Sequence, residues 1–231
     1  MQTNELRETK LKCECYELIF KFQQNYEPEK YKLNRVFSEP DVTIMNIKKQ
    51  KMELRKKVLS DRDQMSTAEI TRASAVISSE IFALEPFQDA RVIAAYMSFG
   101  SEFLTDAFVD ESLRLGKILV LPRVDKVSGS LSFHKWNGEI NQLSEGRWGI
   151  REPNPLICEL IQVSMIDFVL VPGVAFTNQG FRLGYGGGYY DNVISKLTSG
   201  ATAVAAAFSL QLVSSLPREN HDLGVDILIS A

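Results

Sequence analysis

The sequence predicts an α/β fold with an open, mostly parallel, Rossmann-like sheet and helices on both faces, formed by a single domain that follows an N-terminal extension. Short β-rich apolar runs alternate with helical segments over residues 48–229, which is typical of this class. A glycine-rich stretch comes shortly after one of these runs, where such sheets bind ligands. With 231 residues, 45% of them hydrophobic, the chain is long enough for one well-buried core.

Residues 1–46 differ from the rest and are predicted to be a weakly ordered extension of the domain at 47–231. They carry seven basic and eight acidic residues, and Pro28 and Pro40 interrupt any long helix there. Four acids among the first 17 residues are untypical of a mitochondrial presequence, and an uninterrupted apolar secretory region is missing. We expect no targeting segment, and one hypothesis is that translation starts at Met45.

Two helices are predicted at the start of the domain, at 48–62 and 67–84. The first is highly charged, and its apolar residues Met52, Val58 and Leu59 fall on one face. In the second, apolar residues recur at helical spacing, at Ile70, Ala73, Ile77 and Ile81. Both patterns are typical of helices that cover a core with one face.

A crossover unit is predicted next. The runs 91–96 and 117–121 are short and rich in apolar and β-branched residues, and a helical pattern over 104–115 separates them. A helix between two such runs is typical of parallel strands joined by a right-handed crossover. A hairpin over 124–136 follows, with its turn predicted at 128–130 because of the Ser-Gly-Ser sequence there.

A second unit of strand, loop, helix and strand ends the domain. Its strands are predicted at 168–171 and 203–208, with a helix after Gly187, and residues 225–229 are predicted to add a last strand. Open sheets of this kind place ligands at the carboxyl ends of their strands. The glycine-rich stretch lies at such an end.

That stretch, residues 180–191, has five of the chain's 14 glycines within 180–188. Glycine permits positive φ angles and close approach of a ligand to the backbone, so successive N–H groups can converge on an anion. Arg182 adds a guanidinium for phosphate oxygens, and Asp191 adds a carboxylate for a magnesium ion. We therefore favour phosphate chemistry.

The stretch matches neither of two common phosphate motifs. The Gly-Lys pair at 116–117 is followed by Ile118 rather than serine or threonine, which excludes a P-loop there. A dinucleotide fingerprint from Gly184 needs glycine at 189, where Tyr189 stands. A flexible surface turn is the alternative interpretation, and the tyrosines and phenylalanine within the stretch disfavour it, because linkers are typically polar.

Composition excludes several classes of function. The formal net charge of −3 disfavours a protein that binds nucleic acid through bulk positive charge. Three cysteines are too few for a disulfide framework, and the two histidines, His134 and His221, fit neither a zinc site nor a catalytic triad. No apolar run approaches the roughly 20 residues that span a bilayer. We expect a cytoplasmic enzyme without membrane or nucleic-acid partners, as a monomer or weak dimer.

Residues 180–191 resemble the motif Gly-x-Arg-Leu-Gly-x-Gly-x-Gly-Tyr-Tyr-Asp of the 5-formyltetrahydrofolate cyclo-ligases, also called methenyltetrahydrofolate synthetases. Residues 51–55 resemble the Lys-x-x-Leu-Arg of this family, and residues 96–105 its Tyr-x-Ser-x-x-x-Glu-x-x-Thr. Weaker matches lie at 148–153 and 221–226. The resemblance runs in the family's order from Lys48 to about Ile229.

The resemblance implies that the domain at 47–231 cyclises 5-formyltetrahydrofolate to 5,10-methenyltetrahydrofolate, with ATP as co-substrate and Mg²⁺ as cofactor, giving ADP and phosphate. The γ-phosphoryl group would be transferred to the formyl oxygen, and nitrogen 10 of the same substrate would then displace phosphate. Such a reaction needs alignment and charge neutralisation more than a protein nucleophile.

The resemblance also implies the site residues. Arg182 and Tyr189 are expected to be catalytic. ATP is expected to bind the motif residues of the first helix and the glycine-rich stretch: Lys51, Met52, Glu53, Leu54, Arg55, Arg182, Leu183, Gly184, Tyr185, Gly186, Gly187, Gly188, Tyr189 and Tyr190. The reduced folate is expected to contact Met97, Glu102 and Trp148. Asp191 and Asp222 are expected to hold Mg²⁺.

Taken without the resemblance, these residues have plainer interpretations. Lysines in a charged helix are mostly solvated, Asp191 is suited to capping a helix, and Asp222 to a turn. Glu102 would be a surface acid, and Met97 and Trp148 would pack in or near the core.

The chain departs from the family pattern at Thr177, Tyr185 and Asn192, where many members have an acidic residue, a basic residue and arginine. Two further classes of function therefore stay open. One is a non-cyclising relative that binds nucleotide or folate, and the other is an ATP-dependent ligase or kinase with another acceptor.

Overall fold

The computed structural model describes residues 39–125, 129–146 and 150–231, with side chains from residue 46 onward. The chain divides into two units, Met1–Ile44 and Met45–Ala231. The fold described below belongs to the second unit, apart from residues 39–44 at the start of α2, which fall in the first. Its helices are α2 (Glu39–Arg62), α3 (Thr67–Phe82), α4 (Glu85–Asp89), α5 (Asp106–Arg114) and α6 (Tyr189–Ile194). Its strands are β1 (Val92–Ala94), β2 (Ile118–Asp125), β3 (Ser130–Lys135), β4 (Leu143–Glu145), β5 (Arg151–Pro153), β6 (Leu160–Ile161), β7 (Phe168–Leu170), β8 (Ala175–Phe176), β9 (Arg182–Leu183), β10 (Thr202–Ala207) and β11 (Ile227–Ser230).

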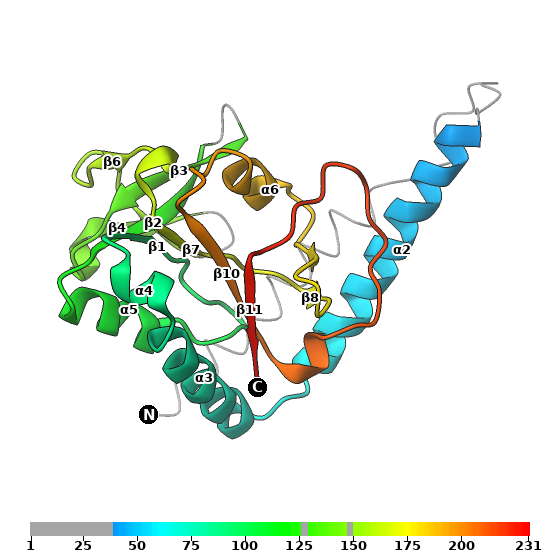
Figure 1. Ribbon diagram of the computed structural model, residues 1–231, viewed down its shortest axis with the longest axis horizontal. Coiled ribbons are helices and arrows are strands. Elements are labelled where there is room, and N and C mark those ends of the chain that lie inside the picture. Colours follow the sequence, from blue (N-terminus) through cyan, green and yellow to red (C-terminus); the bar gives the residue numbers. More distant parts are fainter. Residues whose placement is uncertain (1–38, 126–128, 147–149) are drawn as a thin grey trace. The chain divides into compact units, whose positions relative to one another are not determined.

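A seven-stranded sheet in the order β11-β10-β7-β1-β2-β3-β6 forms the centre of the domain (Figure 1). The neighbouring pairs from β11 to β2 are all parallel, whereas β3 pairs antiparallel with both β2 and β6. The register places Ile93 of β1 opposite Leu119 of β2 and Phe168 of β7. The predicted mostly parallel α/β fold is thus confirmed.

Alternating side chains of the parallel strands fill two cores, one on each face of the sheet. On one face, Ile93, Leu119 and Phe168 pack with α3, α4 and α5, for example against Ile77 and Phe108. On the other face, residues such as Ala94, Val120, Val169 and Ala205 pack with Val193 of α6. Figure 1 shows α3, α4 and α5 grouped together and apart from α6. Helices therefore cover both faces, as the sequence predicts.

Several elements differ from the sequence prediction. α2 begins at Glu39 rather than at 48, and Pro40 lies in its first turn, where the missing N–H of proline has no helical partner to lose. A small hairpin, β8 with β9, follows β7, and its second strand lies within the glycine-rich stretch. The short α4 and the β4–β5 pair were not predicted. The predicted hairpin is formed by β2 and β3, but residues 126–128 lie outside the described part of the chain.

The order of the strands predicts where a ligand would bind the sheet. From β1 the chain passes to β2 on one side, whereas β7, β10 and β11 follow on the other side. Ligands bind open α/β sheets at such a reversal, outside the carboxyl ends of the strands. The segments that leave these ends are 95–105 after β1, 171–188 after β7 and 208–226 after β10. They carry most of the predicted site residues.

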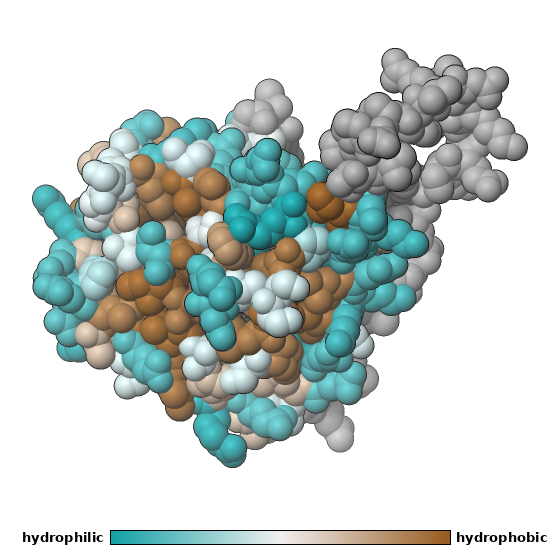
Figure 2. All heavy atoms as spheres, turned by 45° about the vertical axis from the view of Figure 1, so that its right-hand side comes forward, coloured by the Kyte–Doolittle hydropathy of each residue, from teal (hydrophilic) through white to brown (hydrophobic). Residues whose placement is uncertain are grey.

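The face of the molecule shown in Figure 2 has hydrophobic residues near its middle and hydrophilic residues around them. β11 is the edge strand of the sheet, and its four residues are all half-buried. Among the described residues, no helix combines the length and the apolar character that a membrane-spanning helix needs.

Candidate active site

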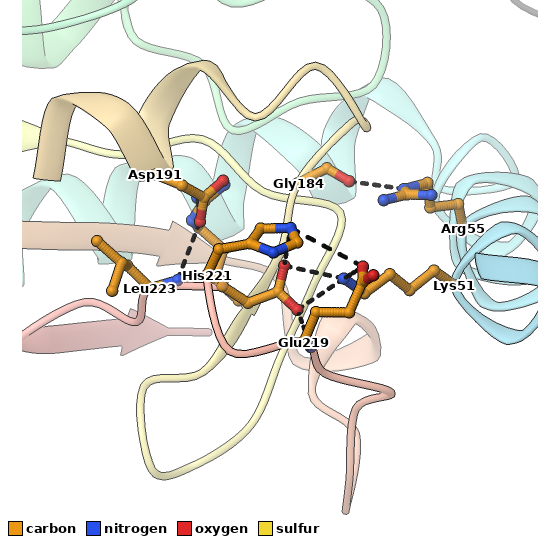
Figure 3. A network of polar contacts seen from close by, with 9 residues as sticks. Lys51, Arg55, Gly184, Asp191, Glu219, His221 and Leu223 are labelled. Carbon is orange, nitrogen blue, oxygen red and sulfur yellow. Dashed lines mark hydrogen bonds and ion pairs between the residues drawn. The ribbon is translucent and has the colours of Figure 1, made fainter. Parts of the chain in front are cut away.

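The inner face of α2 directs two cations toward the glycine-rich stretch. Lys51 and Arg55 lie one helical turn apart, so both side chains project from the same face. The Arg55 Nε donates a hydrogen bond of 2.7 Å to the carbonyl oxygen of Gly184 (Figure 3). Burial lowers the pKa of Arg55 from its ordinary value, and the nearby Asp222 and Glu219 oppose this change. The helix thus contributes positive charge to the edge of the stretch.

Lys51 is buried, and its ammonium group pairs with two carboxylates from the segment after β10. Its Nζ lies 2.7 Å from Glu219 Oε2 and 2.6 Å from Asp222 Oδ2. The Lys51 bond lowers the pKa of Glu219 below its ordinary value. At Asp222, burial acts to raise the pKa, but the bonds from Lys51 and from the Glu219 N–H outweigh it, and the pKa is lowered. Lys51 therefore neutralises carboxylates that would otherwise repel one another and a nucleotide.

Arg182 of β9 is buried beside the start of α6. Its Nη2 donates to Asp191 Oδ1 at 2.9 Å, and Asp191 Oδ1 also accepts the N–H of Leu223 at 3.0 Å. The Nε of Arg182 is buried and has no hydrogen-bond partner among the described residues. A buried donor without a partner costs free energy, so it indicates a place for an acceptor, such as a phosphate oxygen.

Glycines allow the backbone around these cations to fold tightly. Gly186 and Gly188 have φ angles of 107° and 66°, which side chains disfavour. The guanidinium of Arg55 lies below Gly186, where an added Cβ would be 3.6 Å from Arg55 Cζ. At Gly180, an added Cβ would lie only 2.5 Å from the carbonyl oxygen of Val225. This close approach, fixed by a 2.8 Å bond from the Val225 N–H to Gly180, holds the segment of Asp222 beside the glycine-rich stretch.

Glu102 lies on the segment after β1 and is only 4% exposed. The segment is held by reciprocal bonds between Ser98 and Thr105, in which each backbone N–H donates to the hydroxyl of the other residue. Glu102 accepts a 3.1 Å bond from the Phe99 N–H and a short bond from the Tyr185 hydroxyl. Burial raises the pKa of Glu102, although Arg62 and these two bonds act to lower it.

Tyr190 interacts electrostatically with both Glu102 and Arg182. Its hydroxyl is buried and has no hydrogen-bond partner among the described residues. Burial raises the pKa of Tyr190, Glu102 adds to the increase and Arg182 opposes it. The phenol is thus a second donor left for a ligand, near both the carboxylate and the arginine.

The other predicted site residues are placed less specifically. Met52 and Glu53 lie on the exposed side of α2, whereas Leu54 packs against a small core that also contains Leu183. Met97 is half-buried against the main core. The ring of Tyr189 occupies the space that a Cβ at Gly187 would need. Trp148 lies outside the described residues.

Two charged residues of this region were missed in the sequence. Arg62 is buried at the end of α2, and Glu219 lies beside Lys51. Arg62 follows Arg55 by seven residues, two helical turns, so the spacing alone would place it on the face of Lys51 and Arg55. No comparable signal indicates Glu219, because its contact with Lys51 joins residues 168 positions apart.

Fold and site together define a class: an α/β protein in which arginines and a lysine lie near a glycine-rich stretch and a buried carboxylate, beyond the ends of parallel strands. The sequence profile of the 5-formyltetrahydrofolate cyclo-ligase family matches residues 47–231, and the chain belongs to this family.

Individual relatives agree with this membership. The chain is 27% identical over 192 residues to a probable 5-formyltetrahydrofolate cyclo-ligase of Caenorhabditis elegans, a match that covers 79% of this chain and 93% of the relative. The solved structure of Aquifex aeolicus 5,10-methenyltetrahydrofolate synthetase aligns with a TM-score of 0.69 and 34% identity, over 78% of this chain and 89% of that one. The Mycoplasma pneumoniae enzyme of the same name aligns with a TM-score of 0.63 and 25% identity, over 78% and 97%.

Proposed function

We propose that the protein catalyses the ATP-dependent cyclisation of 5-formyltetrahydrofolate to 5,10-methenyltetrahydrofolate, with release of ADP and phosphate. Family membership supports the reaction. The observation that carries it to this site is that Arg55 of α2 contacts the glycine-rich stretch, which itself contains Arg182, while Glu102 accepts a bond from Tyr185 of the same stretch. Lys51 lies one helical turn from Arg55 and pairs with Glu219 and Asp222 beside the stretch. A non-cyclising relative or a ligase with another acceptor has no comparable support.

Within this proposal, the glycine-rich stretch and the three cations bind the triphosphate. Backbone N–H groups of 184–188 and the partnerless Nε of Arg182 supply donors, and Lys51 and Arg55 supply charge. We attribute little of this attraction to the dipole of α6, which has only six residues. Leu54 of α2 and Leu183 of the glycine-rich stretch pack in the same small core and so support the stretch. Contacts of Met52 and Glu53 with ATP stay a prediction.

Glu102 is proposed to bind the pteridine ring. A carboxylate offers about four acceptor sites, and two are used by Phe99 and Tyr185. The remaining sites suit the amino and ring N–H donors of a pterin. Met97, half-buried after β1, would contact the heterocycle through its thioether, and the predicted contact with Trp148 remains a prediction.

The reaction is then mainly a matter of alignment. With the formyl oxygen held near the γ-phosphate, phosphoryl transfer makes that oxygen a leaving group, and nitrogen 10 of the same molecule closes the ring. Arg182 would stabilise the charge that develops on the transferring phosphoryl group. Tyr189, at the start of α6, is proposed to help position it. A protein nucleophile is not required, because the attack is intramolecular.

The carboxylates of Asp191 and Asp222 also suit the Mg²⁺ that accompanies a nucleotide. Hard carboxylate oxygens are the ligands that this ion prefers, and one or two of them suffice. The Leu223 N–H donates a hydrogen bond to Asp191, which joins the segment of Asp222 to the start of α6. Ligand atoms of Glu219, His221 and Asp222 lie within 4.8 Å of one another. Asp191 and Asp222 would hold the ion, which would neutralise phosphate charge.

The direct test is to incubate the purified protein with Mg²⁺, ATP and 5-formyltetrahydrofolate while recording the near-ultraviolet absorbance of the methenyl product and measuring ADP. We expect product and ADP to form in equal amounts, and only when all three components are present. ADP without product would indicate another acceptor, and a folded protein that binds ATP without turnover would indicate a non-cyclising relative.

Replacing Lys51 tests the triphosphate site. In Lys51→Met, the loss of the ammonium group should raise the KM for ATP by roughly 10- to 100-fold. It should also destabilise the fold by about 1–3 kcal/mol, because Glu219 and Asp222 lose their partner. The matched control is Lys49→Met on the same helix, since the Lys49 side chain is 72% exposed. An unchanged KM for ATP in Lys51→Met would remove Lys51 from the site.

Cytoplasmic location and a monomeric or weakly dimeric state remain part of the proposal, together with the absence of membrane and nucleic-acid partners. The formal net charge of −3 supports the expected absence of nucleic-acid partners.

A further inference from the structure

A buried relay of hydrogen bonds joins α2 to the proposed pteridine-binding carboxylate. The Nη2 of Arg62 donates to the Tyr185 hydroxyl at 3.1 Å, and the same hydroxyl donates to Glu102 Oε1. The Nε of Arg62 donates to Ser101 Oγ at 3.0 Å, and Ser101 in turn donates to Asp63. Three elements of the fold, α2, the segment after β1 and the glycine-rich stretch, thus meet at Glu102.

Arg62 and Glu102, which the relay connects, are buried, and Tyr185 between them is half-buried and held by packing. Arg62 is 2% exposed and Glu102 is 4% exposed. The Tyr185 ring packs against Phe99 with a centroid separation of 5.6 Å, so its hydroxyl is directed by contacts on the same segment that carries Glu102. A buried carboxylate is costly to ionise unless a cation and hydrogen-bond donors face it.

We propose that Arg62 and Tyr185 are positioning residues that keep Glu102 ionised and oriented for the pteridine, and that Tyr185 links this carboxylate to the phosphate-binding stretch. The inference rests on the proposed function, because that function assigns Glu102 to the folate. It adds a role to Tyr185, whose hydroxyl lies between the guanidinium of Arg62 and the carboxylate of Glu102.

The surroundings of Glu102 give the expected dependence on pH. Arg62 faces it from α2, with Asp63 beyond Ser101; Tyr185 and Tyr190 face it from the glycine-rich stretch and α6; and Tyr96 faces it from its own segment. Burial raises the pKa of Glu102, and Arg62 and Tyr185 lower it. Without them, the pKa should rise further, and the carboxylate should become protonated at a higher pH.

The test measures the affinity for 5-formyltetrahydrofolate from pH 5.5 to 8.5, with Mg²⁺ and a non-hydrolysable ATP analogue present. In Arg62→Gln we expect the affinity to fall by roughly 10- to 100-fold at low pH and to recover toward the wild-type value as the pH rises. Arg62→Lys keeps the charge and should move the profile back toward the wild-type one. Tyr185→Phe should weaken folate affinity by about tenfold, more than it weakens ATP affinity.

Controls separate this inference from the proposed function. Arg123→Gln breaks an arginine–glutamate pair elsewhere, with Glu152, and should leave the profile unchanged. Glu102→Gln should weaken binding at every pH without a recovery. If the wild-type protein binds no 5-formyltetrahydrofolate, the proposed function is wrong. If the wild-type protein binds 5-formyltetrahydrofolate but Arg62→Gln shows the wild-type profile, or an equal loss of affinity at every pH, the positioning role is wrong. If Arg62→Gln does not fold, Tyr185→Phe decides, and a wild-type folate affinity in that variant would overturn the positioning role.

Discussion

Arg182→Ala is expected to reduce turnover by roughly 100- to 1000-fold while the protein remains folded. The expected loss is large because Arg182 lies within the glycine-rich stretch and its buried Nε has no hydrogen-bond partner in the part of the chain that the structure describes. Its charge would act mainly in the transition state, so kcat should fall more than the KM for either substrate rises. Initial rates at saturating ATP and 5-formyltetrahydrofolate measure this effect.

Stability must be followed in the same variant, because the Arg182 side chain is only 3% exposed. Loss of the Arg182 side chain removes its ion pair with Asp191, although Asp191 still accepts a hydrogen bond from the Leu223 N–H. We therefore expect the free energy of unfolding to fall by about 1–3 kcal/mol. Arg123→Ala is the control: it removes a partly buried arginine on β2 and should change stability without changing kcat. Normal turnover in a folded Arg182→Ala variant would remove Arg182 from the active site.

Glu102→Gln is expected to weaken binding of 5-formyltetrahydrofolate by at least about 100-fold, because an amide presents an N–H₂ group where the pteridine needs an acceptor. ATP binding should change far less, since the hydrogen bond that joins Glu102 to the glycine-rich stretch among the described residues comes from the hydroxyl of Tyr185. Calorimetric titration with each ligand separates the two effects. Equal weakening for both ligands would contradict a specific role in folate binding.

The same substitution should make the stability of the protein less sensitive to pH. Burial raises the pKa of Glu102 above its ordinary value of 4.5, so the folded state favours the neutral acid more than the unfolded state does. The stability contributed by the neutral acid is present below about pH 4.5 and is lost as the pH rises through the folded pKa. Glu102→Gln cannot ionise, so its melting temperature should increase relative to the wild type over that range. A constant difference in melting temperature would contradict the raised pKa.

Much of the fold could be predicted because local patterns agree with the tertiary structure. The helical spacing of Ile70, Ile77 and Ile81 and the short apolar runs around Ile93 and Phe168 correspond to α3, β1 and β7. The two strands of the β8–β9 hairpin have only two residues each, which is too short for a pattern to be detected. The start of α2 was misplaced because its prediction rested on the apolar spacing of Met52, Val58 and Leu59, which does not extend to residues 39–47, whereas Pro40 fits the first turn of the helix.

Prediction of the site had a different limit. Motif residues identified Lys51, Arg55, Arg182 and Glu102 individually, and the structure brings their segments together at the strand ends. Their partners could not be derived, because Lys51 with Glu219 and Arg62 with Tyr185 join residues that are distant in the sequence. Pairing of this kind depends on the tertiary structure, which neither spacing nor composition encodes.

The most direct measurement of the central claim follows the formyl oxygen. The protein is supplied with 5-formyltetrahydrofolate carrying ¹⁸O in its formyl group, with Mg²⁺ and unlabelled ATP, and the released phosphate is analysed by mass spectrometry. If the γ-phosphoryl group is transferred to the formyl oxygen, each methenyl product formed should be matched by one phosphate that contains ¹⁸O. Unlabelled phosphate released together with methenyl product would contradict phosphoryl transfer to the formyl oxygen.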